Sequence, residues 1–162
     1  MAIFLNFNGN KPKGNVTADG YEGWIKLDDF QFAISRGISM ESGNTSNREV
    51  TYPDISEVTI SKVMDGASTG LFKEALTGAK GCTVLIDIVK TGADKIEKYV
   101  AYEFEECLLS NYEMEAYSSS APVENISISF AKITMSYTAG DRTNKGSTPE
   151  RVGYDLAAAK KL

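Results

Sequence analysis

The chain of 162 residues contains no histidine, and this absence excludes more chemistry than any other feature of its composition. Histidine is the side chain most often used as a general base at neutral pH and the commonest ligand of transition metals. A Ser-His-Asp triad is therefore impossible, although serines are numerous. No glycine-rich phosphate loop or dinucleotide-binding fingerprint is present either. The sequence predicts a protein that is not an enzyme and has no cofactor and no metal site.

Cysteine is scarce, with only Cys82 and Cys107. The two residues form no C-x-x-C pair, so neither a zinc site nor a redox motif is indicated. Both fall in one predicted hairpin that turns at residues 92–94. Folding the hairpin there puts Cys82 opposite residue 103 or 104, so the two thiols do not face each other. We therefore expect two buried free thiols in a reducing compartment.

Long hydrophobic runs and clustered positive charge are also missing. No stretch approaches the length of a transmembrane helix, and residues 1–13 lack the basic start and long apolar run of a signal peptide. The formal net charge is −5, and phosphate binding needs a concentrated Lys/Arg surface. We therefore expect no nucleic-acid partner and no membrane insertion. Synthesis in the cytoplasm, with any export through a dedicated machine, is the corresponding expectation.

Alternating apolar residues predict a single, mainly β domain over residues 1–162. Two long runs change phase, one at Asp28-Asp29 and one near Ala131-Lys132. A phase change within a strand indicates a bulge or bend, where the chain passes from one sheet to another. Strands are predicted over residues 3–7, 24–34, 55–63, 83–90, 95–112, 123–138 and 153–156.

One short helix is predicted over residues 68–77, with Ser68 or Thr69 as its N-cap and Gly78 at its C-terminal end. A helix of this length is not stable alone, so its apolar face must dock on the sheets. Bent strands, tight hairpins and one flanking α-helix predict a closed or nearly closed β-barrel of two bent sheets.

Two polar segments interrupt this pattern. Residues 37–54 form a predicted extended loop, and residues 139–162 a polar loop and C-terminal tail. An 18-residue loop in a compact domain is usually functional or interacts with something, so we expect the first segment to contact a partner. The candidate interface residues are Met40, Glu41, Ser42, Gly43, Asn44, Thr45, Ser46, Asn47 and Arg48.

Carboxylates are the only abundant reactive groups. Glu103 and Glu105 share a face of one predicted strand, with their carboxyl groups about 6–7 Å apart. A carbohydrate-active enzyme could use such a pair, with Trp24 as a sugar platform, so a β-barrel hydrolase or lectin is one alternative. The simpler interpretation is the solvated side of a barrel wall, or a charged surface that meets a partner.

Five segments of the chain are informative in their order and spacing. Four of them are GYEGWIKLDDFQFAISRG (20–37), DISEVTISKVMDGASTGLFKEALTG (54–78), KYVAYEFEECLLSNYEM (98–114) and GYDL (153–156). The fifth and most specific is ENISISFAKITMSYT (124–138). These segments resemble the Hcp family, the haemolysin-coregulated tube proteins of type VI secretion, in the family's own order. Two departures are Tyr21, where many members have a histidine, and Tyr154, where a tryptophan is common.

The resemblance implies a β-barrel with one flanking helix that assembles into a hexameric ring. Such rings stack into the inner tube of a type VI secretion system, which a contractile sheath drives outward behind a spike. The lumen can hold secreted effectors, and the tube itself reaches the medium or a target cell. The segment 40–48 would then contact a neighbouring subunit or ring, and Glu103 and Glu105 would face the lumen. A phage-like tail tube protein is the alternative with similar architecture.

Overall fold

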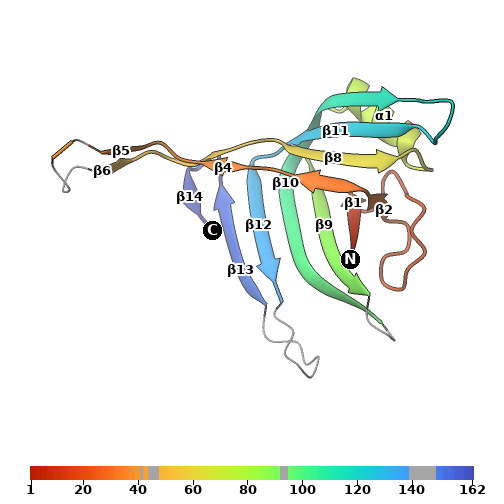
Figure 1. Cartoon of the computed structure of the whole chain (residues 1–162), viewed down its shortest axis with the longest axis horizontal. Coiled ribbons are helices and arrows are strands. Elements are labelled where there is room, and N and C mark those ends of the chain that lie inside the picture. Colours follow the sequence, from red (N-terminus) through yellow and green to blue (C-terminus); the bar gives the residue numbers. More distant parts are fainter. Residues whose placement is uncertain (41, 44–47, 92–94, 139–148) are drawn as a thin grey trace.

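The computed structural model describes residues 1–40, 42–43, 48–91, 95–138 and 149–162, and these form fourteen strands and one helix (Figure 1). The elements are Ala2–Phe7 (β1), Ile25–Leu27 (β2), Asp29–Gln31 (β3), Ile34–Ser35 (β4), Ile38–Met40 (β5), Arg48–Val50 (β6), Asp54–Ile55 (β7), Val58–Val63 (β8), Ser68–Thr77 (α1), Cys82–Thr91 (β9), Ile96–Glu115 (β10), Val123–Ser129 (β11), Lys132–Tyr137 (β12), Glu150–Asp155 (β13) and Lys160–Lys161 (β14).

The strands form two curved sheets that share the 20-residue strand β10. The first sheet has the order β14–β13–β12–β10–β9–β1–β2, and the second has the order β10–β11–β8–β3. The predicted mainly β fold with one helix is confirmed. The closed or nearly closed barrel is not confirmed, because the pairing among the described strands leaves β14 at one end and β2 and β3 unpaired with each other at the other.

Both predicted phase changes are places where the chain moves between the sheets. β2 pairs with β1 and β3 pairs with β8, and only Asp28 separates them. The Asp28 N–H donates to the carbonyl oxygen of Ser61 over 2.8 Å, which holds the corner. Likewise β11 pairs with β8 while β12 pairs with β10 and β13, and the change falls at Phe130 and Ala131. The apolar phase of a sequence is therefore enough to locate a change of sheet.

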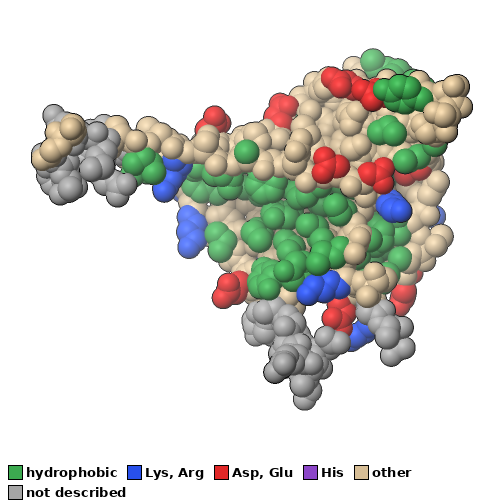
Figure 2. All heavy atoms as spheres, in the orientation of Figure 1, with side chains coloured by type: hydrophobic (Ala, Val, Ile, Leu, Met, Phe, Trp, Pro, Cys, Tyr) green, Lys and Arg blue, Asp and Glu red, His purple; other side chains and the backbone are tan. Residues whose placement is uncertain are grey.

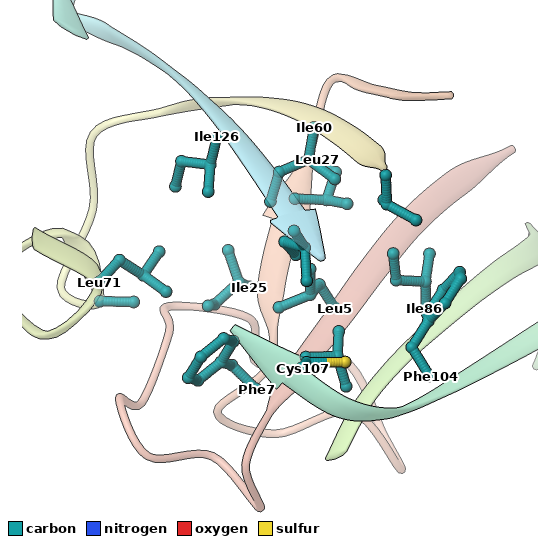
Figure 3. Packing of buried hydrophobic residues seen from close by; sticks show 14 of the residues in the cluster. Leu5, Phe7, Ile25, Leu27, Ile60, Leu71, Ile86, Phe104, Cys107 and Ile126 are labelled. Atoms are coloured by element: carbon teal, nitrogen blue, oxygen red, sulfur yellow. The ribbon is translucent and has the colours of Figure 1, made fainter. Parts of the chain in front are cut away.

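The core lies between the sheets and is built from the inward residues of nearly every long strand (Figure 3). Leu5, Ile86 and Ile126 are almost completely buried there. The helix α1 docks through Leu71, which belongs to the same cluster. Full burial of an aliphatic side chain of this size stabilises the fold by about 1.5–3 kcal/mol.

The helix begins and ends where the sequence predicts, but its predicted N-cap is wrong. The N-cap residue is Ala67, which makes no side-chain capping hydrogen bond. The Ser68 hydroxyl instead accepts the Asp65 N–H over 2.9 Å and donates to Glu124 over 2.8 Å. The carboxylate of Asp65 accepts the Ala67 N–H, so Asp65, rather than Ser68 or Thr69, provides the side-chain hydrogen bond at the start of the helix. The predicted end at Gly78 is confirmed.

The predicted position of Cys82 is also wrong. Cys82 lies opposite Cys107 in the β9–β10 pair, not opposite residue 103 or 104. Two irregularities in β10, between Lys98 and Val100 and between Phe104 and Cys107, each add one residue to that strand. A bulge of this kind advances the register by one, and two bulges bring the thiol positions face to face.

Residues 37–54, predicted as an extended loop, contain paired strands among the described residues. β5 pairs with β6 from Ile38–Val50 to Met40–Arg48, and β4 pairs with β7 closer to the sheets. We call β4, β5, β6 and β7 the arm. In Figure 1 the arm projects away from the two sheets, and among the described strands β5 and β6 pair only with each other.

Candidate assembly surface

Hydrogen bonds between Gly37 and Thr51 hold the arm together between its β4–β7 pair and its β5–β6 pair. The Gly37 N–H donates to Thr51 Oγ1 over 2.8 Å, and the Thr51 N–H donates back to the Gly37 carbonyl oxygen over 3.0 Å. Large apolar side chains on both sides of these bonds are exposed: Ile38 is 54% exposed, Val50 53% and Tyr52 76%. A two-stranded ribbon without a sheet to cover it is only marginally stable in water. The arm therefore has an apolar surface that the rest of the described chain does not bury.

The predicted interface residues divide between described and undescribed positions. Met40 and Arg48 are paired across the arm, and Ser42 and Gly43 are exposed. The remaining five predicted residues lie outside the described part of the chain: Glu41, Asn44, Thr45, Ser46 and Asn47.

An apolar groove of about 470 Å³ lies between the base of the arm and the strands β12, β13 and β14. Ile34 and Ile55 form one side of it, and Met135 and Val152 form the other. Figure 2 shows hydrophobic side chains gathered on this face of the molecule, below the arm. Met135 is 41% exposed and Val152 57% exposed, so the groove is open to solvent. Sequence reasoning missed these residues as a surface, although Met135 and Val152 stand directly opposite each other on paired strands.

The predicted polar pair lies on the other face of β10. Tyr102 lines the groove and Phe104 is in the core, so by strand alternation Glu103 and Glu105 point to the opposite side. Each carboxylate has a cationic partner in the same sheet, Lys132 on the adjacent strand β12 and Arg151 on β13, one strand further away. Arg151 lies 3.4 Å from Glu103, and Lys132 lies 3.4 Å from Glu105. This face is therefore a mixed-charge surface.

The features needed for the carbohydrate alternative are not brought together as a catalytic pair would require. Both carboxylates are engaged by these cations, and Trp24 packs its ring against Tyr21 at a centroid distance of 4.9 Å. Trp24 is half-buried in a second, smaller cluster around Phe4, Tyr21 and Val89. A tryptophan packed in this way is part of the fold.

A buried ionic network joins the helix to the second sheet. Lys62 and Glu124 face each other on β8 and β11, are fully buried, and approach to 2.5 Å. The ammonium group also contacts Asp65 at 2.9 Å, while Ser68 and Tyr112 donate to the Glu124 carboxylate. Burial raises the pKa of Glu124, but the hydrogen bonds from Lys62, Tyr112 and Ser68 outweigh it and lower that pKa below its ordinary value.

The sequence contained a signal for this network that went unused. Val58, Ile60 and Lys62 alternate along β8, and Glu124, Ile126 and Ile128 alternate along β11. Extending each apolar alternation by one step places the lysine and the glutamate inward. Because buried charges are paired, the two residues could have been predicted to meet.

Among the described residues, no group of three or more His, Cys, Asp or Glu side chains is arranged to hold a metal ion. No helix in the described part of the chain is long and apolar enough to cross a membrane.

Solved structures share this fold over nearly the full length of the chain. One described as a type six secretion system protein superposes with a TM-score of 0.90 at 24% identity and covers 99% of both chains. Hcp1 from Salmonella typhimurium gives a TM-score of 0.78 at 20% identity, covering 99% of this chain and 98% of its own. A type VI secretion system effector from Yersinia pestis gives 0.73 at 18% identity, covering 94% and 98%. The fold is thus that of type VI secretion proteins.

The sequence itself assigns the family. Residues 4–137 match the family described as type VI secretion system effector, Hcp, and the chain belongs to this family. A search of curated proteins finds no match. The resemblance seen in the sequence is therefore confirmed over most of the chain.

Proposed function

We propose that this protein is a structural subunit of the inner tube of a type VI secretion system, assembling as hexameric rings that stack into a tube. Membership of the Hcp family over residues 4–137 carries the proposal. A structural role also agrees with the missing histidine.

The arm and the groove supply the two halves of a repeating interface. Ile38, Val50 and Tyr52 on the arm are exposed apolar side chains that project away from the sheets, while the groove lies at the arm's base. An interface between two different surfaces of the same chain propagates from copy to copy and closes into a ring when its rotation allows. A stable contact needs about 1,200–2,000 Å² of buried surface, and an exposed arm adds greatly to that area. In this proposal, segment 40–48 contacts the next subunit or ring.

The proposed lumen wall, outer partners and cellular location follow from the role as a tube subunit. The mixed-charge face with Glu103 and Glu105 suits the wall of a water-filled lumen that carries secreted effectors, and the sheath and spike are the outer partners. The subunit is made in the cytoplasm and exported by the machine itself. We also propose that the wall is barrel-like, because Asp28 joins β2 directly to β3 and bonds to Ser61 of β8.

The test is the mass and shape of the purified chain, measured by light scattering after gel filtration and by negative-stain electron microscopy. We expect rings in the unmodified protein. Met135→Glu puts a charge into the groove and should yield monomers. Met114→Glu is the matched control, because Met114 is 51% exposed and lies outside the groove, and it should leave rings intact. A strictly monomeric unmodified chain at high concentration would contradict the proposal.

Deleting residues 41–49 tests the arm separately. The shortened chain should fold, with an unchanged circular dichroism spectrum in the β region, yet assemble or stack poorly. Assembly equal to that of the full chain would show that the arm has no part in the interface.

A further inference from the structure

Cys82 and Cys107 stand directly opposite each other on antiparallel strands, and no part of the proposed function accounts for this arrangement. Residues directly opposite in such a pair point to the same face of the sheet. Here that face is the core side: Cys107 is buried in the main cluster, and Cys82 packs against the same cluster at its edge (Figure 3). The Cys82 thiol lies 3.6 Å from the Cys107 carbonyl oxygen, so its sulfur sits over the partner residue.

The backbone around the pair is shaped to bring these strands close. Glu106, next to Cys107, has a φ of 56°, in the left-handed region that a non-glycine residue seldom adopts. Gly81, next to Cys82, packs on that residue: a Cβ at Gly81 would lie 2.8 Å from the Glu106 Cα. A side chain at position 81 would force the strands apart. The bulge and the glycine together set the register that pairs the two cysteines.

This geometry matches what a disulfide needs. Opposite residues in an antiparallel pair have Cβ atoms about 4.5–5.5 Å apart, and their Cα atoms are separated by about 4.5–5.5 Å. Disulfides span Cα atoms about 4.4–6.8 Å apart, with Cβ atoms at about 3.5–4.5 Å, so a small approach of the two strands suffices. Both cysteines are free thiols in the structure.

We propose that Cys82 and Cys107 are an oxidation site that forms an intramolecular disulfide. The oxidant is a low-molecular-weight disulfide such as oxidised glutathione, and the product links β9 covalently to β10. The Cys82 thiolate attacks one sulfur of glutathione disulfide, the glutathione S–S bond breaks, and one glutathione leaves and takes up a proton. The Cys107 thiolate then attacks the Cys82 sulfur and displaces the second glutathione. Two electrons pass from the two cysteines to one glutathione disulfide.

Cys82 reacts first because it is partly exposed, whereas Cys107 is buried. The reaction is slow at neutral pH. Burial, with the negative charges of Glu74 and Glu106, raises the pKa of Cys82 to about 11, and burial raises the pKa of Cys107 to about 12. Since the thiolate is the nucleophile, the rate should rise about tenfold per pH unit between pH 7 and 9. In the reducing cytoplasm the pair stays free. An oxidising medium outside the cell, which the proposed export would reach, supplies the oxidant.

The test places the full chain in glutathione redox buffers of increasing oxidised-to-reduced ratio, at pH 8.5, both folded and in denaturant. Intact mass and non-reducing peptide mapping then give the fraction carrying the Cys82–Cys107 bond. We expect the folded chain to be half oxidised at a ratio at least about tenfold lower than the unfolded chain, because the fold holds the thiols together. We also expect the bond to raise the thermal midpoint of the folded chain.

A matched control moves one thiol by a single position. Cys107→Ser combined with Leu108→Cys keeps the loop length nearly constant but places the second thiol on the opposite face of β10. Unfolded, this variant should behave like the natural chain; folded, it should give only the glutathione adduct at Cys82. The proposal is overturned if the folded natural chain stays reduced, or stops at the glutathione adduct, at ratios where the unfolded chain is bridged. Ring assembly in the reduced chain is measured separately, so failure of the tube proposal and of this one can be told apart.

Discussion

Replacing Lys62 with methionine removes the ammonium group at the centre of the buried network and keeps a side chain of similar length. Glu124 then loses the cation paired with it and stays fully buried, and among the described residues it keeps hydrogen bonds only from Ser68 and Tyr112. Asp65, which also contacts Lys62 in the natural chain, is left with no counterion in this network but is more exposed.

The expected cost follows from what is left behind. Removing one partner of a buried ion pair typically destabilises a protein by about 3–5 kcal/mol, because the other charge remains in a poorly solvated place. Unfolding entropy of about 2.1 cal/mol/K per residue over 162 residues converts 1 kcal/mol into about 3 °C. We therefore expect the midpoint of thermal unfolding to fall by about 9–15 °C at pH 7.

The pH dependence gives the prediction a second signature. In the natural chain the pKa of Glu124 is below its ordinary value near 4.5, so its contribution to stability is present above that pH and is lost as the pH falls through the folded pKa. In Lys62→Met, burial without a cation raises the pKa of Glu124, and stability then falls as the pH rises from about 4.5. The difference between the two proteins should be widest at neutral pH and narrow toward pH 4.

The assay is urea unfolding at several pH values, followed by circular dichroism and by the fluorescence of the single tryptophan, Trp24. The double variant Lys62→Met, Glu124→Gln removes both charges and keeps an acceptor for Ser68 and Tyr112. It should recover at least half of the lost stability. A loss below about 1 kcal/mol, a loss independent of pH, or a double variant less stable than the single one would refute the reasoning.

Four further substitutions test other parts of the structure, each by the same unfolding measurement. Gly14→Ala should destabilise the fold by about 1–3 kcal/mol, because the added Cβ would lie 2.7 Å from the Trp24 carbonyl carbon; an unchanged midpoint would mean that this loop shifts freely. Leu71→Ala should cost about 2–5 kcal/mol, since Leu71 is the buried contact of α1, and a loss under 1 kcal/mol would show that the helix does not depend on it. Glu103→Gln and Glu105→Gln should each cost less than about 1 kcal/mol, because their ion pairs are exposed, whereas a large loss from either would indicate a buried role.

Strand phase was the most informative property of the sequence. At two places, Asp28 and near Ala131, the apolar residues change from one alternate set of strand positions to the other, and these places are the two changes of sheet. The reason is that a strand that enters a second sheet must turn its other face inward. The helix bounds were predicted for a similar reason, since Gly78 and the apolar face of 68–77 are local signals.

Register could not be predicted in the same way. The pairing of Cys82 with Cys107 depends on two bulges in β10, and Glu106 adopts a left-handed conformation although nothing about a glutamate indicates one. Bulges arise from the fit between strands far apart in the fold, which a single sequence does not display.

The interface role of segment 40–48 was predicted from the polarity and length of the surrounding loop, and it stays a prediction. The strands β5 and β6 were not predicted, because they are short and, among the described strands, pair only with each other. The groove brings together β4, β7, β10, β12, β13 and β14, and its position depends on tertiary packing. Exposed apolar residues such as Val152 look like ordinary strand residues until the surface around them is seen.

The shared strand β10 has a consequence for how the molecule comes apart. Its first part pairs with β9 and β12 and its second part with β11, so loss of this strand would divide the first sheet between β9 and β12 and remove an edge strand from the second. Amide protons on both sides of the fold should therefore exchange with solvent through one common opening event, while those of β5 and β6 exchange independently and faster. A mechanical force applied to either sheet would be transmitted to the other through β10, so both sheets would resist it together.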